Sequence, residues 1–299
     1  MEVITISLHV DGRYIRDNLN NIVFLRGVNR GQFHDETTGA WGGWNTFDSA
    51  SVDFELDNMK AWGINVLRLY VAMDFWIQDP LHRGYIKTII EKAATRGIYV
   101  IYAPWTVKHM TSQEPLPFPP YTISTDIIPT EQAFIDFWRS VAQELGVYPN
   151  VIFEPYNEPN GDTVAEATWF RVLQQVIDAI RVISNNLIIV QWSYAAWWGA
   201  TVDDGTLNWI TNFPLTGTNL VYSTHLYRFH NHLGPDRPFD YNTIKQRLTD
   251  MQYPWVGVTL NKPLLIGEIG ANVWYTGVEL TNELAAYQEI LKILNEWGL

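Results

Sequence analysis

The chain has 299 residues, of which 47% are hydrophobic, and it carries a formal net charge of −12. This length and apolar content predict one large globular domain, or two small ones. The negative charge argues against nucleic acid and anionic membranes as partners, because both attract basic proteins. Since the sequence contains no cysteine, disulfides, thiolate metal sites and a cysteine nucleophile are excluded.

The N-terminal part predicts a small hairpin at residues 8–21. Asp11 and Gly12 form one typical turn sequence, and the asparagine-rich stretch at residues 18–21 forms another. Apolar runs rich in β-branched and aromatic residues follow. Most begin as continuous hydrophobic stretches, which is typical of strands buried on both faces of a parallel sheet. The predicted strands are residues 22–29, 64–71, 98–105, 150–159, 187–192, 220–227 and 263–270.

Helical patterns separate these runs. Apolar residues recur at helical spacing in residues 52–63, 85–97, 131–146, 165–184 and 281–298, and several of these segments end at a glycine. A strand followed by a helix, repeated along the chain, predicts an α/β fold. We expect a single (β/α)8 TIM-barrel catalytic domain over residues 1–299, with the small hairpin at the bottom of the barrel.

The eighth strand of such a barrel is missing from the pattern. Little chain remains after the last predicted helix, at residues 281–298, whereas a complete barrel needs a further strand. We therefore expect a C-terminally truncated barrel whose first and last strands have unpaired edges. The alternatives are that the hairpin or a neighbouring chain closes the gap.

Polar residues gather at the predicted strand ends. In a β/α barrel the active site lies at the carboxyl ends of the strands, and the polar residues found there are Arg68, Asn157, Glu158, His225, Tyr227 and Glu268. Each has an ordinary structural explanation when taken singly, such as an ion pair for the arginine or a core position for the histidine. Their placement at the same end of four different strands favours a site. Glu154 has no such motif, and we expect it to make a structural hydrogen bond or ion pair.

Glu158 and Glu268 are predicted to face each other across the barrel mouth. A separation of about 5 Å would match retaining glycoside hydrolysis, in which one carboxyl group is acid and then base and the other is the nucleophile. Arg68 and Tyr227 would keep Glu268 ionised, and that charge would keep Glu158 protonated at rest. Strict strand alternation puts Asn157 and Glu158 on opposite faces, so we expect a bulge or twist there.

Three motifs follow one another at the predicted strand ends: "NEP" at residues 157–159, "HLY" at residues 225–227 and "GEIG" at residues 267–270. With the segment at residues 11–29, they resemble glycoside hydrolase family 5, whose barrels carry catalytic glutamates on strands 4 and 7. The resemblance covers almost the whole chain. It implies that Glu158 is the acid/base and Glu268 the nucleophile. Asn157 would then bind the sugar 2-hydroxyl. His225 would contact the acid/base, Tyr227 would contact the nucleophile, and Arg68 would support the nucleophile.

The sequence departs from that family at two places. Family members often carry a histidine at the end of strand 3, where this chain reads "APWT" at residues 103–106, and His109 shortly afterwards could substitute. They also place a tryptophan on strand 8, which has no counterpart here.

Tryptophan is abundant, with 14 residues, many of them in loop-like segments. Flat rings suit the CH-rich face of a pyranose. The candidates for binding sugars are Trp105, Trp192, Trp197 and Trp274.

These observations predict a retaining, endo-acting hydrolase that binds a β-glycan polysaccharide or oligosaccharide and cleaves β-1,4-glucan. The alternatives are a β-1,4-mannanase on the same scaffold and a catalytically weak carbohydrate-binding barrel. A metal-dependent hydrolase would need clustered His, Asp and Glu at several strand ends, so we expect no metal and no cofactor. The polymeric substrate suggests a secreted or extracellular protein, although residues 1–10 contain no signal-peptide pattern.

Overall fold

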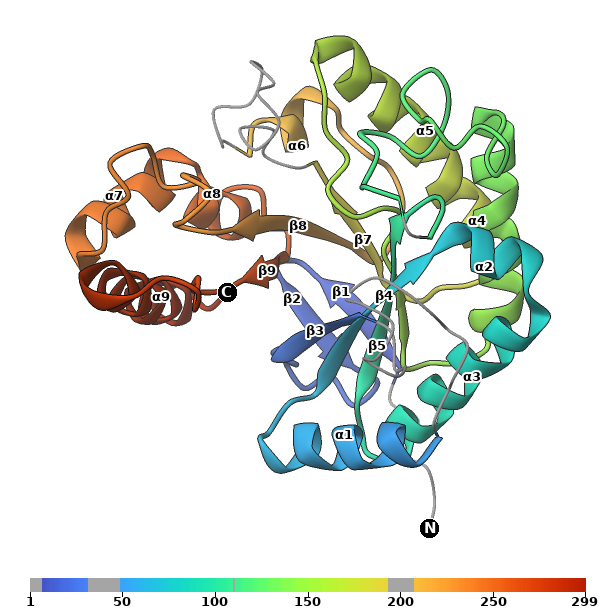
Figure 1. Cartoon of the computed structure of the whole chain (residues 1–299), viewed down its shortest axis with the longest axis horizontal. Coiled ribbons are helices and arrows are strands. Elements are labelled where there is room, and N and C mark those ends of the chain that lie inside the picture. Colours follow the sequence, from blue (N-terminus) through green and yellow to red (C-terminus); the bar gives the residue numbers. More distant parts are fainter. Residues whose placement is uncertain (1–6, 32–48, 110, 193–206) are drawn as a thin grey trace.

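The computed structural model describes residues 7–31, 49–109, 111–192 and 207–299 (Figure 1). Two strands, β1 (Leu8–Asp11) and β2 (Tyr14–Asp17), form an antiparallel hairpin. The other described strands form one seven-stranded parallel sheet in which spatial order follows chain order. They are β3 (Gly27–Gly31), β4 (Val66–Ala72), β5 (Tyr99–Thr106), β6 (Val151–Phe153), β7 (Ile188–Gln191), β8 (Leu220–Leu226) and β9 (Leu264–Ile269).

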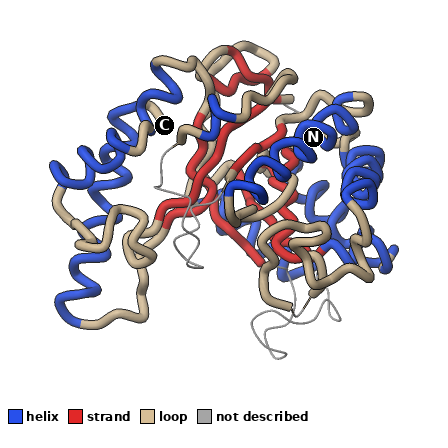
Figure 2. Tube along the Cα trace, turned by 90° about the horizontal axis from the view of Figure 1, so that it is seen from above, coloured by secondary structure: helices blue, strands red, loops and turns tan. Residues whose placement is uncertain are grey.

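Helices follow the strands and lie around the outside of the sheet, as Figure 1 and Figure 2 show. They are α1 (Ser49–Ala61), α2 (Met73–Gln78), α3 (Pro80–Ala94), α4 (Glu131–Leu145), α5 (Thr163–Arg181), α6 (Trp209–Asn212), α7 (Tyr241–Asp250), α8 (Tyr253–Val258) and α9 (Gly277–Trp297). The alternation of parallel strands and helices confirms the predicted barrel fold. None of the described helices combines the length and apolarity needed to cross a membrane.

Side-chain caps explain where several helices begin. Thr130, Asp162 and Asp240 precede α4, α5 and α7, and each side chain accepts a hydrogen bond from a backbone amide in the first turn. The first amides of a helix have no acceptor within the helix. These caps supply one, which stabilises a helix by about 0.5–2 kcal/mol.

The first barrel strand starts later than the sequence predicts. The apolar run predicts a strand at residues 22–29, whereas β3 spans Gly27–Gly31. The amide of Val23 donates to the carbonyl oxygen of Ile15 at 2.9 Å. The start of this run therefore pairs with the hairpin instead of with the barrel, and periodicity alone cannot tell these two partners apart.

Apolar side chains form two core layers. The larger lies between the sheet and the helices, and the smaller lies inside the barrel toward the amino ends of the strands. Leu8 and Ile15 of the hairpin belong to the inner layer, and the amide of Val10 donates to Oδ1 of Asn219, directly before β8, at 2.9 Å. The hairpin therefore closes the bottom of the barrel, as predicted, and the opposite end of the strands is left for a site.

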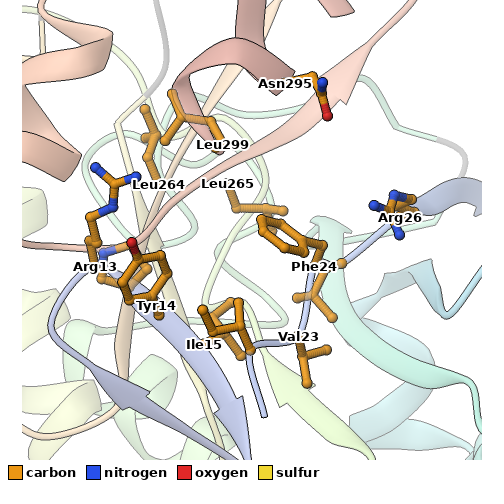
Figure 3. Close-up of a pocket in the computed structure, with 14 residues that line it drawn as sticks. Arg13, Tyr14, Ile15, Val23, Phe24, Arg26, Leu264, Leu265, Asn295 and Leu299 are labelled. Atoms are coloured by element: carbon orange, nitrogen blue, oxygen red, sulfur yellow. The ribbon is translucent and has the colours of Figure 1, made fainter.

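The barrel has an open seam between β3 and β9, which are not paired with each other in the described part of the chain. Asn29 on β3 bridges the two edges, because its Nδ2 donates to the carbonyl oxygen of Gly267 on β9 at 3.2 Å. Toward the amino ends of these strands lies a cavity of about 180 Å³ whose lining is both polar and apolar (Figure 3). Ile15, Phe24 and Leu299 are among its lining residues. The sheet thus has the seven strands that the sequence predicts, and truncation of the chain stays a prediction.

Candidate active site

The structure brings together the polar residues that the sequence places at strand ends. Arg68 lies on β4, His225 on β8 and Glu268 on β9, while Tyr227 follows β8 directly. The strand predicted at residues 150–159 is shorter than expected, because β6 ends at Phe153. Asn157 and Glu158 therefore lie in the irregular segment after that strand. Hydrogen bonds join Arg68 to Glu268 and Asn157, and Glu268 to Tyr227. Glu158 bonds to His225, whose Nδ1 lies 3.5 Å from Oε1 of Glu268, so the six residues form one cluster.

Arg68 is the centre of the cluster and is buried, with 3% of its side chain exposed. Its guanidinium pairs with both carboxylate oxygens of Glu154, which confirms the structural ion pair expected for that residue. It also donates to Oε1 of Glu268 at 2.7 Å and to Oδ1 of Asn157 at 2.8 Å. Burial by itself would lower the pKa of Arg68, but the charges of Glu154 and Glu268 raise it above its ordinary value. Arg68 therefore stays charged and holds the side chains of Glu154, Glu268 and Asn157 in place.

Glu268 is held by donors on both oxygens. Oε1 accepts from Arg68 at 2.7 Å and from the hydroxyl of Tyr70 at 2.5 Å, and Oε2 accepts from the hydroxyl of Tyr227 at 2.8 Å. Burial by itself would raise the pKa of Glu268, but the charges of His225 and Arg68 and the two tyrosine hydroxyls lower it to about 2. Glu268 is therefore ionised near neutral pH, as a carboxylate nucleophile must be.

Tyr70 and Asn29 belong to the site, although the sequence reasoning missed them. Tyr70 lies two positions after Arg68 on β4, and alternate residues of a strand share one face, so strand spacing was the available signal. Asn29 accepts from Arg68 at 3.3 Å while its amide reaches Gly267 across the seam. No comparable spacing rule connects Asn29 to the site.

Glu158 and His225 form a second pair, with 2.7 Å between Oε1 and Nδ1. A contact this short holds one proton, carried by either group. Burial by itself would lower the pKa of His225, but Glu268 and Glu158 raise it. The pair therefore keeps a transferable proton beside the ionised Glu268.

The backbone at Glu158 adopts a left-handed conformation, with φ of +48°. Such a conformation costs a residue with a Cβ atom about 1–2 kcal/mol and is concentrated at functional sites. Of the expected bulge or twist, the structure shows no bulge within β6, because the chain has already left the strand at this point; the change of direction comes from the irregular segment that follows it. In this irregular segment, which includes the left-handed residue, the consecutive side chains of Asn157 and Glu158 both point into one site.

One oxygen of Glu158, one nitrogen of His225 and one oxygen of Glu268 lie within 4.8 Å of one another, a spacing that could hold a metal ion. Arg68 argues against a cation there, because its charge lies 2.7 Å from Oε1 of Glu268 and occupies that oxygen. The arrangement suits a different chemistry. It combines an ionised carboxylate with a second carboxyl group that shares a proton, as acid-assisted nucleophilic substitution needs.

The side-chain amide of Asn157 presents an unused donor. Its Oδ1 is fixed by Arg68, whereas its buried Nδ2 has no hydrogen-bond partner within the described residues. An unpaired buried donor costs about 1–3 kcal/mol. The amide is therefore suited to bind an oxygen of a ligand in the site.

The predicted aromatic residues differ in their placement. Trp274 follows β9 and is 89% exposed, and Trp105 lies half-buried on β5. Trp192 is 3% exposed and packs in the core between sheet and helices, where its ring lies 6.1 Å from that of Phe170. A sugar-stacking role for Trp192 therefore has no support, because its faces are covered. Trp197 lies outside the described residues.

His109, the suggested substitute for a histidine at the end of strand 3, follows β5 by a few residues. Its Nδ1 pairs with Asp74, and its ring stacks on Phe75 with 4.4 Å between centroids. These contacts tie His109 to α2. The contacts described for it do not include either carboxylate of the site.

Comparison with known proteins identifies the family. A family model described as Cellulase (glycosyl hydrolase family 5) matches residues 30–298. The chain is 33% identical to an endoglucanase from Clostridium saccharobutylicum over 179 residues, which is 57% of this chain and 35% of that protein. It is 28% identical to endoglucanase MaCel5A from Microbulbifer sp. over 227 residues, which is 74% of this chain and 39% of that protein. The matches thus span less than half the length of these relatives.

Solved structures show the same fold. A hyperthermophilic endocellulase from Pyrococcus horikoshii has a TM-score of 0.74 at 22% identity, covering 100% of this chain and 89% of that one. The catalytic domain of endoglucanase Cel5A from Thermobifida fusca, in complex with cellotetraose, has a TM-score of 0.64 at 19% identity, covering 98% and 82%. Because the family model matches nearly the whole sequence, the chain belongs to the cellulase family, glycosyl hydrolase family 5.

Proposed function

We propose that this protein hydrolyses internal bonds of β-1,4-glucan with retention of anomeric configuration, using Glu158 as acid/base and Glu268 as nucleophile. The main observation in support is that one carboxylate oxygen of Glu158 lies within 4.8 Å of one carboxylate oxygen of Glu268. Retaining glycosidases separate these groups by about 5–5.5 Å, whereas inverting ones leave about 6.5–9.5 Å for a water molecule. The endoglucanase names of the relatives support the choice of substrate.

In the first step, a Glu268 oxygen forms a bond to the anomeric carbon while the glycosidic bond breaks. The leaving oxygen takes the proton that Glu158 and His225 hold between them. Arg68 and the tyrosine hydroxyls keep Glu268 ionised for this attack. The product is a glycosyl ester of Glu268, and one part of the glucan leaves.

In the second step, water attacks the anomeric carbon and gives a proton to Glu158. The ester bond to Glu268 breaks, and its electron pair returns to the carboxylate. Two displacements at one carbon restore the original configuration. The 2.7 Å contact between Glu158 and His225 keeps the acid/base oriented through both steps.

Asn157 is proposed to bind the sugar 2-hydroxyl through the unused Nδ2. Hydrogen bonds to this hydroxyl strengthen in the transition state of glycoside hydrolysis, so the contact favours rate as well as binding. Trp274 and Trp105 lie at or after the carboxyl ends of their strands. Both are proposed as stacking surfaces for neighbouring sugar units.

A β-1,4-mannan is the second candidate substrate. A structure of Cel5A from Thermotoga maritima in complex with mannotriose has a TM-score of 0.61 at 17% identity. Glucan and mannan differ in the direction of the 2-hydroxyl, the group assigned here to Asn157. The preference therefore depends on the surroundings of that amide.

The substrate is tested by reducing-sugar assays on carboxymethyl-cellulose, glucomannan and galactomannan, side by side and with viscosity followed in parallel. Activity on carboxymethyl-cellulose with an early fall in viscosity supports an endo-acting glucanase. Activity confined to galactomannan would replace this proposal by a mannanase. No activity on any of the three would leave a carbohydrate-binding barrel as the better description.

The roles are tested with Glu268→Ala and Glu158→Ala, each of which should lower kcat by several orders of magnitude. Azide should restore activity to both variants. The nucleophile variant should then yield an α-glycosyl azide, and the acid/base variant a β-glycosyl azide. Glu283→Ala is the control for loss of a carboxylate that pairs with a buried arginine, because Glu283 pairs with Arg228 but lies on α9, away from the site. Normal activity in either site variant, or an α-anomer as the first product seen by NMR, contradicts the assignment.

A further inference from the structure

The hydroxyl of Tyr70 helps to keep Glu268 ionised, but the roles given above make no use of which carboxylate oxygen it contacts. It donates to Oε1 of Glu268 at 2.5 Å and accepts from Nη1 of Arg68 at 2.9 Å. The guanidinium carbon of Arg68 also lies 4.9 Å from the centroid of the tyrosine ring. Tyr70 is thus held by its ring and by its hydroxyl, so the donor beside the carboxylate has a fixed direction.

The two oxygens of Glu268 differ in how many donors they receive. Oε1 accepts from Arg68 at 2.7 Å and from Tyr70 at 2.5 Å, and Nδ1 of His225 lies 3.5 Å away. Oε2 accepts from Tyr227 at 2.8 Å. Each oxygen of an ionised carboxylate offers about two lone-pair sites. Both sites of Oε1 are therefore in use, while Oε2 keeps one for the reaction.

We propose that Tyr70 is a positioning residue that, together with Arg68, occupies both lone-pair sites of Oε1 and so assigns Oε2 as the oxygen that attacks the sugar. This inference rests on the proposed role of Glu268 as nucleophile. A lone pair of Oε2 forms the bond to the anomeric carbon. The glycosidic bond breaks with its electrons going to the leaving oxygen, which takes the proton from Glu158.

Oε1 becomes the carbonyl oxygen of the resulting ester, still facing Tyr70 and Arg68. In the second step the oxygen of water replaces Oε2 at the anomeric carbon, and a water proton goes to Glu158. Tyr70 keeps its donor on Oε1 through both steps. Its function is to fix the rotation of the Glu268 carboxylate, so that the same oxygen always points at the sugar.

A tyrosine hydroxyl on a carboxylate is a charge-assisted hydrogen bond and favours the ionised form. The groups that face Glu268 are Arg68 and Tyr70 from β4, His225 from β8, Tyr227, His230 and His232 from the segment after β8, and Glu158 from the segment after β6. Replacing Tyr70 by phenylalanine leaves every charge in this set unchanged. The contribution of one hydrogen bond can therefore be measured by itself.

The first test compares Tyr70→Phe with Tyr99→Phe on an activated aryl β-cellobioside. Tyr99 is a matched control, because it packs in the same inner cluster of the barrel and lies at the start of β5, away from the site. Losing one hydrogen bond to a charged group predicts a fall in kcat of about 10- to 100-fold for Tyr70→Phe. The change in KM should be less than about threefold, because the bond acts on the nucleophile and not on substrate binding.

The pH profile separates this role from a merely structural one. The acidic limb of kcat/KM should move to higher pH by about one unit in Tyr70→Phe, since the ionised form of Glu268 loses a donor. Tyr99→Phe should leave both kcat and the limb unchanged. An unmoved limb in Tyr70→Phe, in protein with a native circular dichroism spectrum, overturns the inference.

The second test locates the attacking oxygen. A crystal structure of the wild-type enzyme trapped with a 2-deoxy-2-fluoro-cellobioside should show the sugar on the Glu268 oxygen that faces Tyr227, with the hydroxyl of Tyr70 on the ester carbonyl. A sugar attached to the oxygen that faces Arg68 and Tyr70 overturns the inference.

The two levels of proposal fail in distinguishable ways. If wild-type protein neither hydrolyses the glycoside nor becomes labelled, the proposed function is wrong. If it is labelled at Glu268 but Tyr70→Phe keeps the wild-type profile, the role of Tyr70 alone is wrong. The ¹³C signal of the Glu268 carboxyl, assigned by its loss in Glu268→Gln, gives a readout without turnover and should start to titrate at higher pH in Tyr70→Phe.

Discussion

Gly267 and His225 lie so close together that a Cβ atom at position 267 would be 2.9 Å from Nε2 of the histidine. The same Cβ atom would lie 2.9 Å from Oγ of Ser223. Glycine at this position is therefore a steric requirement of the neighbouring imidazole. That imidazole in turn sets the position of Glu158 through the 2.7 Å contact at its other nitrogen.

Gly267→Ala should push the His225 ring away and lengthen its contact with Glu158. A misplacement of about 1 Å can cost a hundredfold in rate, and an added methyl in a tight site costs about 1–3 kcal/mol of stability. Gly270→Ala is the control, because its Cβ would lie 3.5 Å from Tyr227, an ordinary contact. Kinetics and thermal unfolding of both variants check this. Equal effects of the two substitutions would contradict the steric argument.

The pH dependence of activity should be bell-shaped with a broad top. Glu268 loses its charge near pH 2, well below the ordinary glutamate value of 4.5, so the acidic limb of kcat/KM should lie in that low range. The basic limb should lie above 6.5, the ordinary value from which the pKa of His225 is raised, because the proton shared with Glu158 is lost there. A profile of kcat/KM across this range, checked for irreversible unfolding, tests both limbs. A flat profile contradicts the scheme of two carboxyl groups.

The same groups predict how stability changes with pH. The depressed pKa of Glu268 stabilises the fold above the ordinary value of 4.5, and this contribution is lost as pH falls toward about 2. Its size is on the order of 3 kcal/mol. The raised pKa of His225 stabilises the fold below 6.5, and this contribution is lost as pH rises through the folded value. The free energy of unfolding, measured in urea at a series of pH values, should fall more steeply with decreasing pH in wild type than in Glu268→Gln. Identical pH dependences of the two proteins below pH 4.5 would be inconsistent with this linkage.

The fold could be predicted because the strands β4 to β8 are buried along nearly their whole length and so read as continuous apolar runs. The helices that the sequence reasoning missed give weaker signals. In α7, Ile244 and Leu248 are the buried residues of the described helix, so its apolar stripe spans little more than one turn. The helices α2, α6 and α8 are each six residues or shorter, too short for a periodic pattern.

The site could be predicted as far as strand ends determine it. Parallel strands of a barrel meet at one rim, which brought Arg68 and Glu268 together in the sequence reasoning as in the structure. The left-handed backbone at Glu158 could not be predicted, because residue type does not reveal it. Trp192 failed as a contact surface for a related reason. It is the last residue of a predicted strand, at the end where the site lies, whereas Phe170 and the surrounding core, distant in the chain, cover its ring.

Arg68 and Arg228 allow the stability of a buried ion pair to be separated from its catalytic role. Both arginines are buried and pair with a buried glutamate, Glu154 and Glu283 respectively. Breaking such a pair leaves an uncompensated charge and costs about 3–5 kcal/mol. Arg68→Met and Arg228→Met should therefore lower stability by similar amounts in urea unfolding.

The two variants should differ in activity. Arg68→Met removes the charge that fixes Glu268 and Asn157. Its kcat, measured under conditions in which the variant is still folded, should therefore fall by several orders of magnitude. Arg228→Met should retain most of its kcat under the same conditions. Comparable kcat in the two variants would show that Arg68 acts through folding alone.

The open seam between β3 and β9 predicts the least protected backbone of the sheet. In a parallel sheet an interior strand bonds to a neighbour on each side, whereas β3 and β9 each have one neighbour in the described part of the chain. Hydrogen exchange should therefore be faster in these two strands than in β5 and β8.

An extension after Leu299, which lines the seam cavity, could place a further parallel strand between the two edges. Such a strand-and-helix extension should slow exchange in β3 and β9, raise the melting temperature and increase kcat. The control is the same extension with prolines at alternate strand positions, since proline cannot donate to a sheet. If the 299-residue chain equals the extended chain in exchange, melting temperature and kcat, the seam is not a strand-accepting edge, and the Asn29 bridge and the hairpin close the barrel without one.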